Sequence, residues 1–127
     1  MAYISQTDKK ELAPAIKKVL KKYGFRGTIS INNYSDLTVT VRKGTMDLAS
    51  ILDNVKKYGH TQVNTFMHQI DNFYSGDFKQ FILELVAAMK GDKWYDRSDI
   101  MTDYFDTAYY LSIDIGTYKK PYEMLGA

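Results

Sequence analysis

The sequence predicts an α+β domain in which an antiparallel sheet, made of an N-terminal hairpin and a C-terminal strand, has helices packed on one face. Apolar residues recur every three or four positions in residues 7–23 and 76–90, as on one side of a helix. They alternate with polar residues in 28–41 and 109–115, as in strands with one buried face. A chain of 127 residues fits a single domain covering 1–127.

The first helix is expected within residues 7–23. Gly24 follows it and suits the left-handed backbone conformation that commonly ends a helix. Its apolar stripe consists of Leu12, Ile16, Val19, Leu20 and Tyr23. Pro14 has no backbone N–H to donate, so the helix is expected to begin near Ala13 or to kink there. The face opposite the stripe carries Lys17, Lys18, Lys21 and Lys22.

The rest of the chain predicts a hairpin, two helices and further strands. Residues 28–32 (TISIN) and 37–41 (LTVTV) flank a turn, with the apolar side chains toward the core and Thr and Ser toward water. A short helix is expected in 45–58, a short strand near 61–66, and a strong helix in 76–90. The tail after the C-terminal strand is expected to be a turn and a peripheral end.

Composition narrows the class of protein. The aromatic share is 14%, with 11 tyrosines, which suits either boundary packing or an interaction face. The absence of cysteine excludes disulfides, zinc–thiolate sites and thiol nucleophiles. The net charge of +2 is uneven, because residues 1–28 hold seven Lys or Arg and two acids, whereas 92–127 hold four and seven. No signal peptide or long apolar run is recognisable, so we expect a soluble intracellular protein with no membrane partner.

A run of aspartates precedes the C-terminal strand, in WYDRSDIMTDYFDTAYYLSIDIG (residues 94–116). Its members, at the spacing of one helical face, are Asp96, Asp99, Asp103 and Asp106. Helix capping and turn chemistry is the simplest interpretation, because aspartate bonds nearby backbone amides in such places. An acidic contact patch and a metal site are the alternatives. The run lacks the central glycine and the twelfth-position glutamate of a calcium loop, so no metal is predicted.

The lysine face is a second candidate site. Together with Arg26, its lysines can follow phosphates through a salt-dependent attraction, although such a face is also the ordinary solvated side of a helix. His60 and His68 lack the spacing of metal ligands. No phosphate-binding loop or nucleophile elbow is present, so neither an enzyme nor a cofactor is predicted.

Three segments carry a resemblance: APAIKKVLKKYG (residues 13–24), QVN (62–64) and DRSDIMTDYFDTAYYLSIDIGTYKKPY (96–122). They resemble a family of small uncharacterised proteins of large tailed bacteriophages, and also a small domain associated with large polyvalent phage proteins. In the last segment the matching residues are Ser98, Asp99, Met101, Thr102, Asp103, Tyr104, Phe105, Asp106, Tyr109, Ile115, Gly116, Lys120, Pro121 and Tyr122. A proline is usual in that pattern where Thr65 stands. The resemblance implies a phage accessory protein in the host cytoplasm and no particular activity.

The favoured hypothesis is a non-enzymatic phage protein that binds a host macromolecule and inhibits a defence or nucleic-acid-processing component. Its contact residues, facing a basic surface, are expected to be Asp96, Asp99, Asp103, Asp106, Tyr104 and Tyr110. The alternative is a nucleic-acid-binding module that uses Lys17, Lys18, Lys21, Lys22 and Arg26. The two oppositely charged ends also allow a homodimer, with the basic helix of one copy against the acidic stretch of the other.

Overall fold

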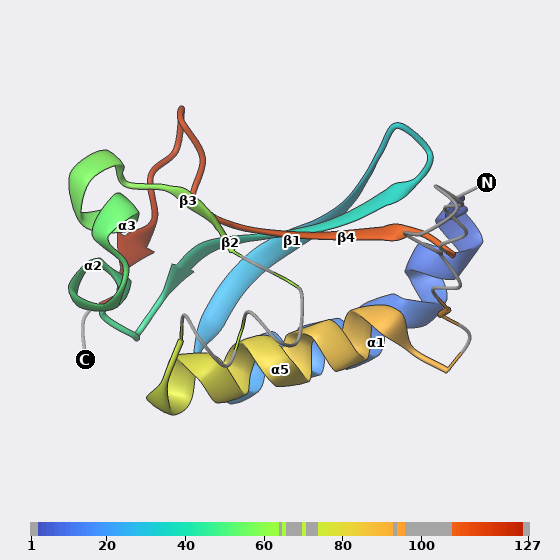
Figure 1. Ribbon diagram of the computed structural model, residues 1–127, viewed down its shortest axis with the longest axis horizontal. Helices are drawn as coiled ribbons and strands as arrows, with labels where there is room; N and C mark the ends of the chain where they lie inside the picture. The colour runs from blue at the N-terminus through green and yellow to red at the C-terminus, as the bar shows by residue number, and fades with distance from the viewer. Residues whose placement is uncertain are drawn as a thin grey trace, which may run out of the picture.

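The computed structural model describes residues 3–63, 65, 70, 74–92, 94–95 and 108–125. It confirms the α+β class, because helices are combined with one five-stranded sheet. Two long helices, α1 (Gln6–Lys22) and α5 (Gly76–Lys90), lie side by side on one face of the sheet (Figure 1). Two short helices, α2 (Leu48–Ile51) and α3 (Asp53–Tyr58), lie at the end of the sheet away from the N-terminus. Among the helices described, none combines the length and apolar character needed to cross a bilayer.

The sheet is mixed, which corrects the prediction of an antiparallel one. Its strands run in the order β1 (Phe25–Asn32), β2 (Asp36–Gly44), β4 (Tyr110–Ile115) and β3 (Thr61–Val63). The β1–β2 and β3–β4 pairs are antiparallel, whereas β2 and β4 are parallel. A parallel neighbour requires a long crossover connection, and the helices and β3 between β2 and β4 supply it.

A fifth strand, β5 (Glu123–Met124), continues the line of β4 after a loop. The last residue of β4 lies opposite Val41 of β2, and β5 resumes opposite Lys43 and Gly44 of the same strand, again in parallel. The tail was predicted to be peripheral, but it forms part of the sheet.

Helix α1 begins well before Pro14, so a start near Ala13 was wrong. Ser5 and Asp8 form a capping box, in which the Asp8 amide donates to Ser5 Oγ at 3.1 Å and the Ser5 amide donates to Asp8 Oδ2 at 3.0 Å. Pro14 lies on the exposed side of the helix, where water can reach the Lys10 carbonyl that proline leaves without a donor.

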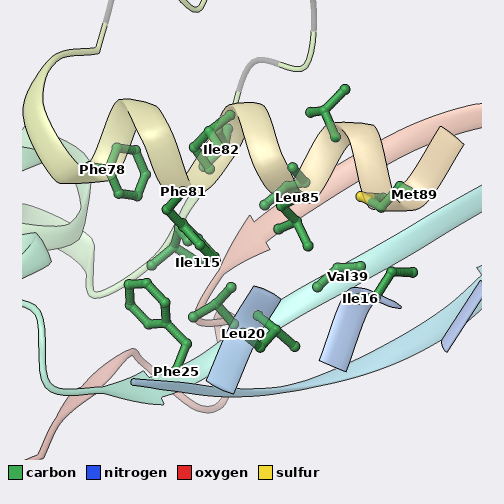
Figure 2. Close-up of a cluster of buried hydrophobic side chains, with 14 of the residues drawn as sticks. Ile16, Leu20, Phe25, Val39, Phe78, Phe81, Ile82, Leu85, Met89 and Ile115 are labelled. Carbon is green, nitrogen blue, oxygen red and sulfur yellow. The ribbon is translucent and has the colours of Figure 1, made fainter. Parts of the chain in front are cut away.

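The core lies between the two long helices and the sheet (Figure 2). Phe81 of α5 packs against Phe25 of β1, with ring centroids 4.4 Å apart. The fully or almost fully buried side chains include Ile16, Leu20, Val39, Phe78, Phe81, Ile82, Leu85, Met89 and Ile115. Each contributes about 1.5–3 kcal/mol of burial free energy relative to exposure. The helix predicted for residues 76–90 has the same bounds in the structure. The apolar stripe that predicted it is the side of α5 that is buried in the core.

Candidate functional site

Most of the predicted contact residues lie outside the part of the chain that the structure describes. These are Asp96, Asp99, Asp103, Tyr104 and Asp106. Tyr110 is described: it is the first residue of β4 and is 51% exposed. Its amide donates to the Ser35 carbonyl oxygen at 2.7 Å, which joins the start of β4 to the turn between β1 and β2.

Exposed tyrosines gather around Tyr110 at one end of the molecule, called here the tyrosine end. Its members are Tyr3, Tyr34, Tyr95 and Tyr110. Backbone hydrogen bonds link their segments: the Ile4 amide donates to Tyr34, the Tyr3 amide to Ala108 and the Ala108 amide to Tyr95, each at 2.9 Å. Figure 1 shows the N-terminus, the β1–β2 turn and the start of β4 together at this end. The chain therefore enters and leaves the acidic residues 96–107 at the tyrosine end.

Tyr34 occupies a strained backbone conformation at the tip of the β1–β2 turn. The φ angles of Asn33 and Tyr34 are +54° and +60°, in the left-handed region that a bulky side chain disfavours. The Tyr34 side chain is 79% exposed, so burial does not offset this strain. A strained and exposed aromatic residue points to a role in binding, since folding gains little from it.

A groove of about 470 Å³ lies between α1 and the C-terminal end of α5. Its polar lining includes Asp8, Glu11 and Lys90. The Lys90 ammonium lies 4.5 Å from the centre of the Trp94 ring, and the Trp94 indole donates to the Tyr109 carbonyl oxygen at 2.8 Å. These contacts tie α5 to the chain that precedes β4, which gives this region a structural role.

The predicted basic residues are all exposed, but Lys22 differs from the others. Lys22 Nζ lies 2.7 Å from Glu84 Oε1 on α5, and the Tyr23 hydroxyl donates to the same carboxylate. The hydrogen bonds from Lys22 and Tyr23 lower the pKa of Glu84, and the bond to Glu84 raises the pKa of Lys22. Lys22 therefore fastens α1 to α5. In the described structure no carboxylate forms an ion pair with Lys17, Lys18, Lys21 or Arg26.

The sheet face turned away from α1 and α5 is polar. Asn32 Nδ2 donates to Thr38 Oγ1 at 2.7 Å, and Ser112 Oγ donates to Asp36 Oδ2 at 2.8 Å. Burial, followed by the nearby charge of Asp36, raises the pKa of the Asp114 carboxyl on this face. Within the residues described, no three His, Cys, Asp or Glu side chains gather in a way that could hold a metal ion.

A second exposed aromatic cluster lies at the opposite end of the molecule, and it was not predicted. The His60 ring contacts those of Tyr58 and Tyr118, with ring centroids 6.5 and 6.4 Å away. The signal in the sequence was a pair of similar segments, KKYGH (residues 56–60) and TYKKPY (117–122), which are distant along the chain. His68, the other histidine, lies outside the described residues.

Comparisons with protein families, curated proteins and solved structures find no match for this chain. The phage resemblance therefore stays a prediction from the sequence. Within the described residues, the tyrosine end and the cluster around His60 carry exposed aromatic side chains that lie outside the core.

Proposed function

We propose that this chain is a non-catalytic phage accessory protein that binds a host protein in the host cytoplasm through its tyrosine end. The partner is a component of a defence or nucleic-acid-processing system, alone or in complex with nucleic acid, and binding inhibits it. The observation that carries the proposal is the strained and exposed Tyr34 beside the exposed Tyr110. The resemblance to phage proteins supports the host setting.

Exposed tyrosines on a preorganised backbone make effective anchors for a partner. A tyrosine ring buries a large area while ordering only two side-chain torsions, and its hydroxyl can still form a polar contact. The segments of the tyrosine end are hydrogen-bonded to one another, so binding would require little ordering of the backbone. Such rings typically dominate the binding free energy of an interface.

The partner surface is proposed to be basic. Asp96, Asp99, Asp103 and Asp106 belong to the stretch of chain that leaves the tyrosine end at Tyr95 and returns at Ala108. Carboxylates around an aromatic centre steer a basic partner toward it and disfavour acidic ones. A nuclease or a DNA-binding complex presents a basic surface of this kind.

The test is affinity capture from infected host cells, with the lysate treated with nuclease to remove partners bridged by nucleic acid. Three tagged forms are compared: the wild type, Tyr34→Ala/Tyr110→Ala, and Tyr58→Ala/Tyr118→Ala as a control that removes two exposed rings from the opposite end. We expect one host protein to be captured by the wild type and the control, and at least about tenfold less by the Tyr34/Tyr110 variant. Equal capture by all three forms would contradict the proposal.

Charge reversal separates the acidic contribution from the aromatic one. Asp99→Lys/Asp103→Lys is expected to slow association with the purified partner and to reduce its salt dependence. Addition of the wild-type protein at stoichiometric concentration is expected to suppress the partner's activity. If the partner binds this variant as fast as the wild type, its surface is not basic.

A second candidate function is nucleic-acid binding through α1. It is favoured by the exposure of Lys17, Lys18, Lys21 and Arg26, with Lys22 engaged by Glu84. This function predicts binding to duplex or single-stranded nucleic acid that weakens steeply with salt and is lost in Lys17→Glu/Lys21→Glu. Absence of a gel shift at low salt and micromolar protein would remove this candidate.

A further inference from the structure

We propose a second binding surface, for single-stranded nucleic acid, at the end of the molecule opposite the tyrosine end. It consists of residues 56–60 and 118–120 and is called here the lysine–tyrosine patch. The side chains that would contact the ligand are Lys56, Lys57, Tyr58, Tyr118, Lys119 and Lys120. This surface is separate from the one proposed for the protein partner, and each can be tested without the other.

The two segments of the patch are built against each other. The Tyr122 amide donates to the Gly59 carbonyl oxygen at 2.7 Å. A Cβ on Gly59 would lie 2.5 Å from Cβ of Pro121, and the Gly59 φ of +82° also favours glycine. Figure 1 shows the loop between β4 and β5 rising beside β3, near α3. Two segments that are distant in the sequence therefore form one surface.

The two tyrosine rings project from this surface. Tyr58 is 65% exposed and Tyr118 is 86% exposed. Both contact the His60 ring, whose centroid lies 6.5 Å from that of Tyr58 and 6.4 Å from that of Tyr118, so the tyrosine centroids are at most about 13 Å apart. This separation lets one extended strand place a base on each ring, because every base has a flat face that stacks on an aromatic side chain.

Lysines adjoin both rings in the sequence. Lys56 and Lys57 precede Tyr58, and Lys119 and Lys120 follow Tyr118, while no Asp or Glu occurs in residues 54–63 or 115–122. All four lysines are exposed, and in the described part of the chain none of them forms an ion pair. The nearest acid along the chain after the patch, Glu123, lies 3.8 Å from Lys43 instead. The patch thus offers phosphate contacts beside stacking faces.

These features favour a single strand over other anionic partners. In a duplex the bases stack on one another and are out of reach of exposed rings, whereas unpaired bases are accessible. An anionic membrane would attract the same lysines. However, the residues adjoining the two rings in the sequence are lysine, glycine and threonine, not large apolar side chains that enter lipid. The lysines of α1 lack such rings, because Tyr23 is partly buried and bonded to Glu84.

The test is fluorescence anisotropy with the full chain and a labelled oligonucleotide of mixed sequence. Single-stranded DNA, single-stranded RNA, the duplex of the same sequence and vesicles containing phosphatidylserine are compared. We expect a single strand to bind more tightly than the duplex or the vesicles, and the DNA and RNA arms decide which strand is preferred. The logarithm of the binding constant is expected to fall with the logarithm of salt with a slope of about −3, since four lysines contribute about −0.7 each.

Variants assign the binding to the patch. Tyr58→Ala/Tyr118→Ala is expected to weaken binding at least about tenfold, whereas Tyr58→Phe/Tyr118→Phe keeps the rings and keeps binding. Lys57→Glu/Lys119→Glu is expected to weaken binding and reduce the salt slope, while the same charge change on α1, Lys17→Glu/Lys21→Glu, has the smaller effect. All four patch side chains changed here are exposed, and thermal melting of each variant verifies that it is folded.

The proposal would be overturned by no binding to single strands at low salt, equal or tighter binding to the duplex, tighter binding to vesicles, or unchanged binding by the Tyr58→Ala/Tyr118→Ala variant. A larger loss from the α1 variant than from the patch variant would also overturn it. Tyr34→Ala/Tyr110→Ala is expected to bind single strands like the wild type. Failure of the protein-partner proposal would therefore leave this result unchanged, and the reverse also holds.

Discussion

The hydroxyl of Tyr109 lies 2.5 Å from the carbonyl oxygen of Met89, so the residue that precedes β4 closes the C-terminal end of α5. The last carbonyls of a helix lack partners within it, and Tyr109 is buried. Tyr109→Phe keeps the ring and removes the donor, so the free energy of unfolding is expected to fall by about 1–2 kcal/mol in urea denaturation. Tyr110→Phe, at the exposed neighbouring position, is the control and should stay within about 0.5 kcal/mol of the wild type. If the Tyr109 variant is as stable as the wild type, this bond contributes nothing.

Stability is expected to decline at alkaline pH because two tyrosines keep their protons in the folded state. Burial raises the pKa of Tyr109 and of Tyr122 from 10.0 to about 12. The unfolded chain loses these protons near pH 10 and the folded chain near pH 12, so the free energy of unfolding falls across that window. Tyr122 is only partly buried, so solvent screening reduces its contribution to this decline. Denaturant titrations from pH 9 to 12 should show a shallower decline in Tyr109→Phe/Tyr122→Phe; an unchanged decline would contradict this assignment.

Asp114 is expected to destabilise the fold at neutral pH. Burial, and then the charge of Asp36, raises its pKa above 3.8, so the folded state disfavours the ionised carboxylate. The free energy of unfolding is therefore expected to fall as pH rises from 3.8 through the folded pKa. Asp114→Asn should raise the melting temperature slightly at pH 7 and leave it unchanged near pH 3. Asp36→Asn should also raise it slightly at pH 7, because the charge near Asp114 is removed while the amide oxygen can still accept from Ser112 Oγ. A lower melting temperature for Asp114→Asn at pH 7 would contradict the argument.

Tyr34 is expected to lower the stability of the fold and to strengthen binding of the host partner. Glycine adopts the left-handed conformation without the steric cost that a Cβ imposes, and Asn-Gly is the preferred pair for a tight hairpin turn with two positive φ angles. Tyr34→Gly should therefore raise the free energy of unfolding by about 1 kcal/mol while weakening capture of the host partner. Tyr34→Phe should change neither by much. A less stable Tyr34→Gly variant would show that the ring makes a stabilising contact.

The two charged ends predict self-association that depends on salt. Equilibrium sedimentation at low salt is expected to give a mass above that of the monomer, and high salt should return it to the monomer because screening weakens the attraction. Lys17→Glu/Lys21→Glu should be monomeric in both conditions. A wild-type chain that is monomeric at low salt would exclude this association.

The local elements could largely be predicted from the sequence, whereas their arrangement could not. The helix over residues 76–90 was evident because its apolar pattern matches the face that it buries, and the hairpin was evident from the alternation in its strands. The prediction that the threonines of the hairpin face water was wrong for β2, because Thr38 and Thr40 are buried. Pairing of β4 with β2 was not evident, since alternation within a strand does not specify its neighbour or direction. The predicted range 7–23 for the first helix agrees with α1 to within one residue at each end, and only the alternative start near Ala13 was wrong, because the capping box of Ser5 and Asp8 starts the helix ahead of Pro14.

The candidate sites, like the fold, could be predicted only where they depend on local sequence. Tyr110 was predicted as a contact residue, and it is exposed at the start of β4, while the predicted aspartates lie outside the described residues. The strain at Tyr34 could not be predicted, because the turn sequence contains no glycine, the residue that usually indicates a positive φ angle. The lysine–tyrosine patch depends on the approach of Gly59 to Pro121, a tertiary contact that neither segment reveals alone.

The path of β4 and β5 along β2 has an evolutionary consequence. Both strands are registered on β2, one ending opposite Val41 and the other starting opposite Lys43, and the loop that separates them leaves the sheet and returns to the same track. Gly116, Pro121 and Tyr122 hold the ends of this loop against Gly59 and the core, whereas residues 118–120 at its tip are exposed. The tip can therefore change in sequence without shifting the core, and relatives of this chain would be free to acquire new ligands there while keeping an unchanged scaffold.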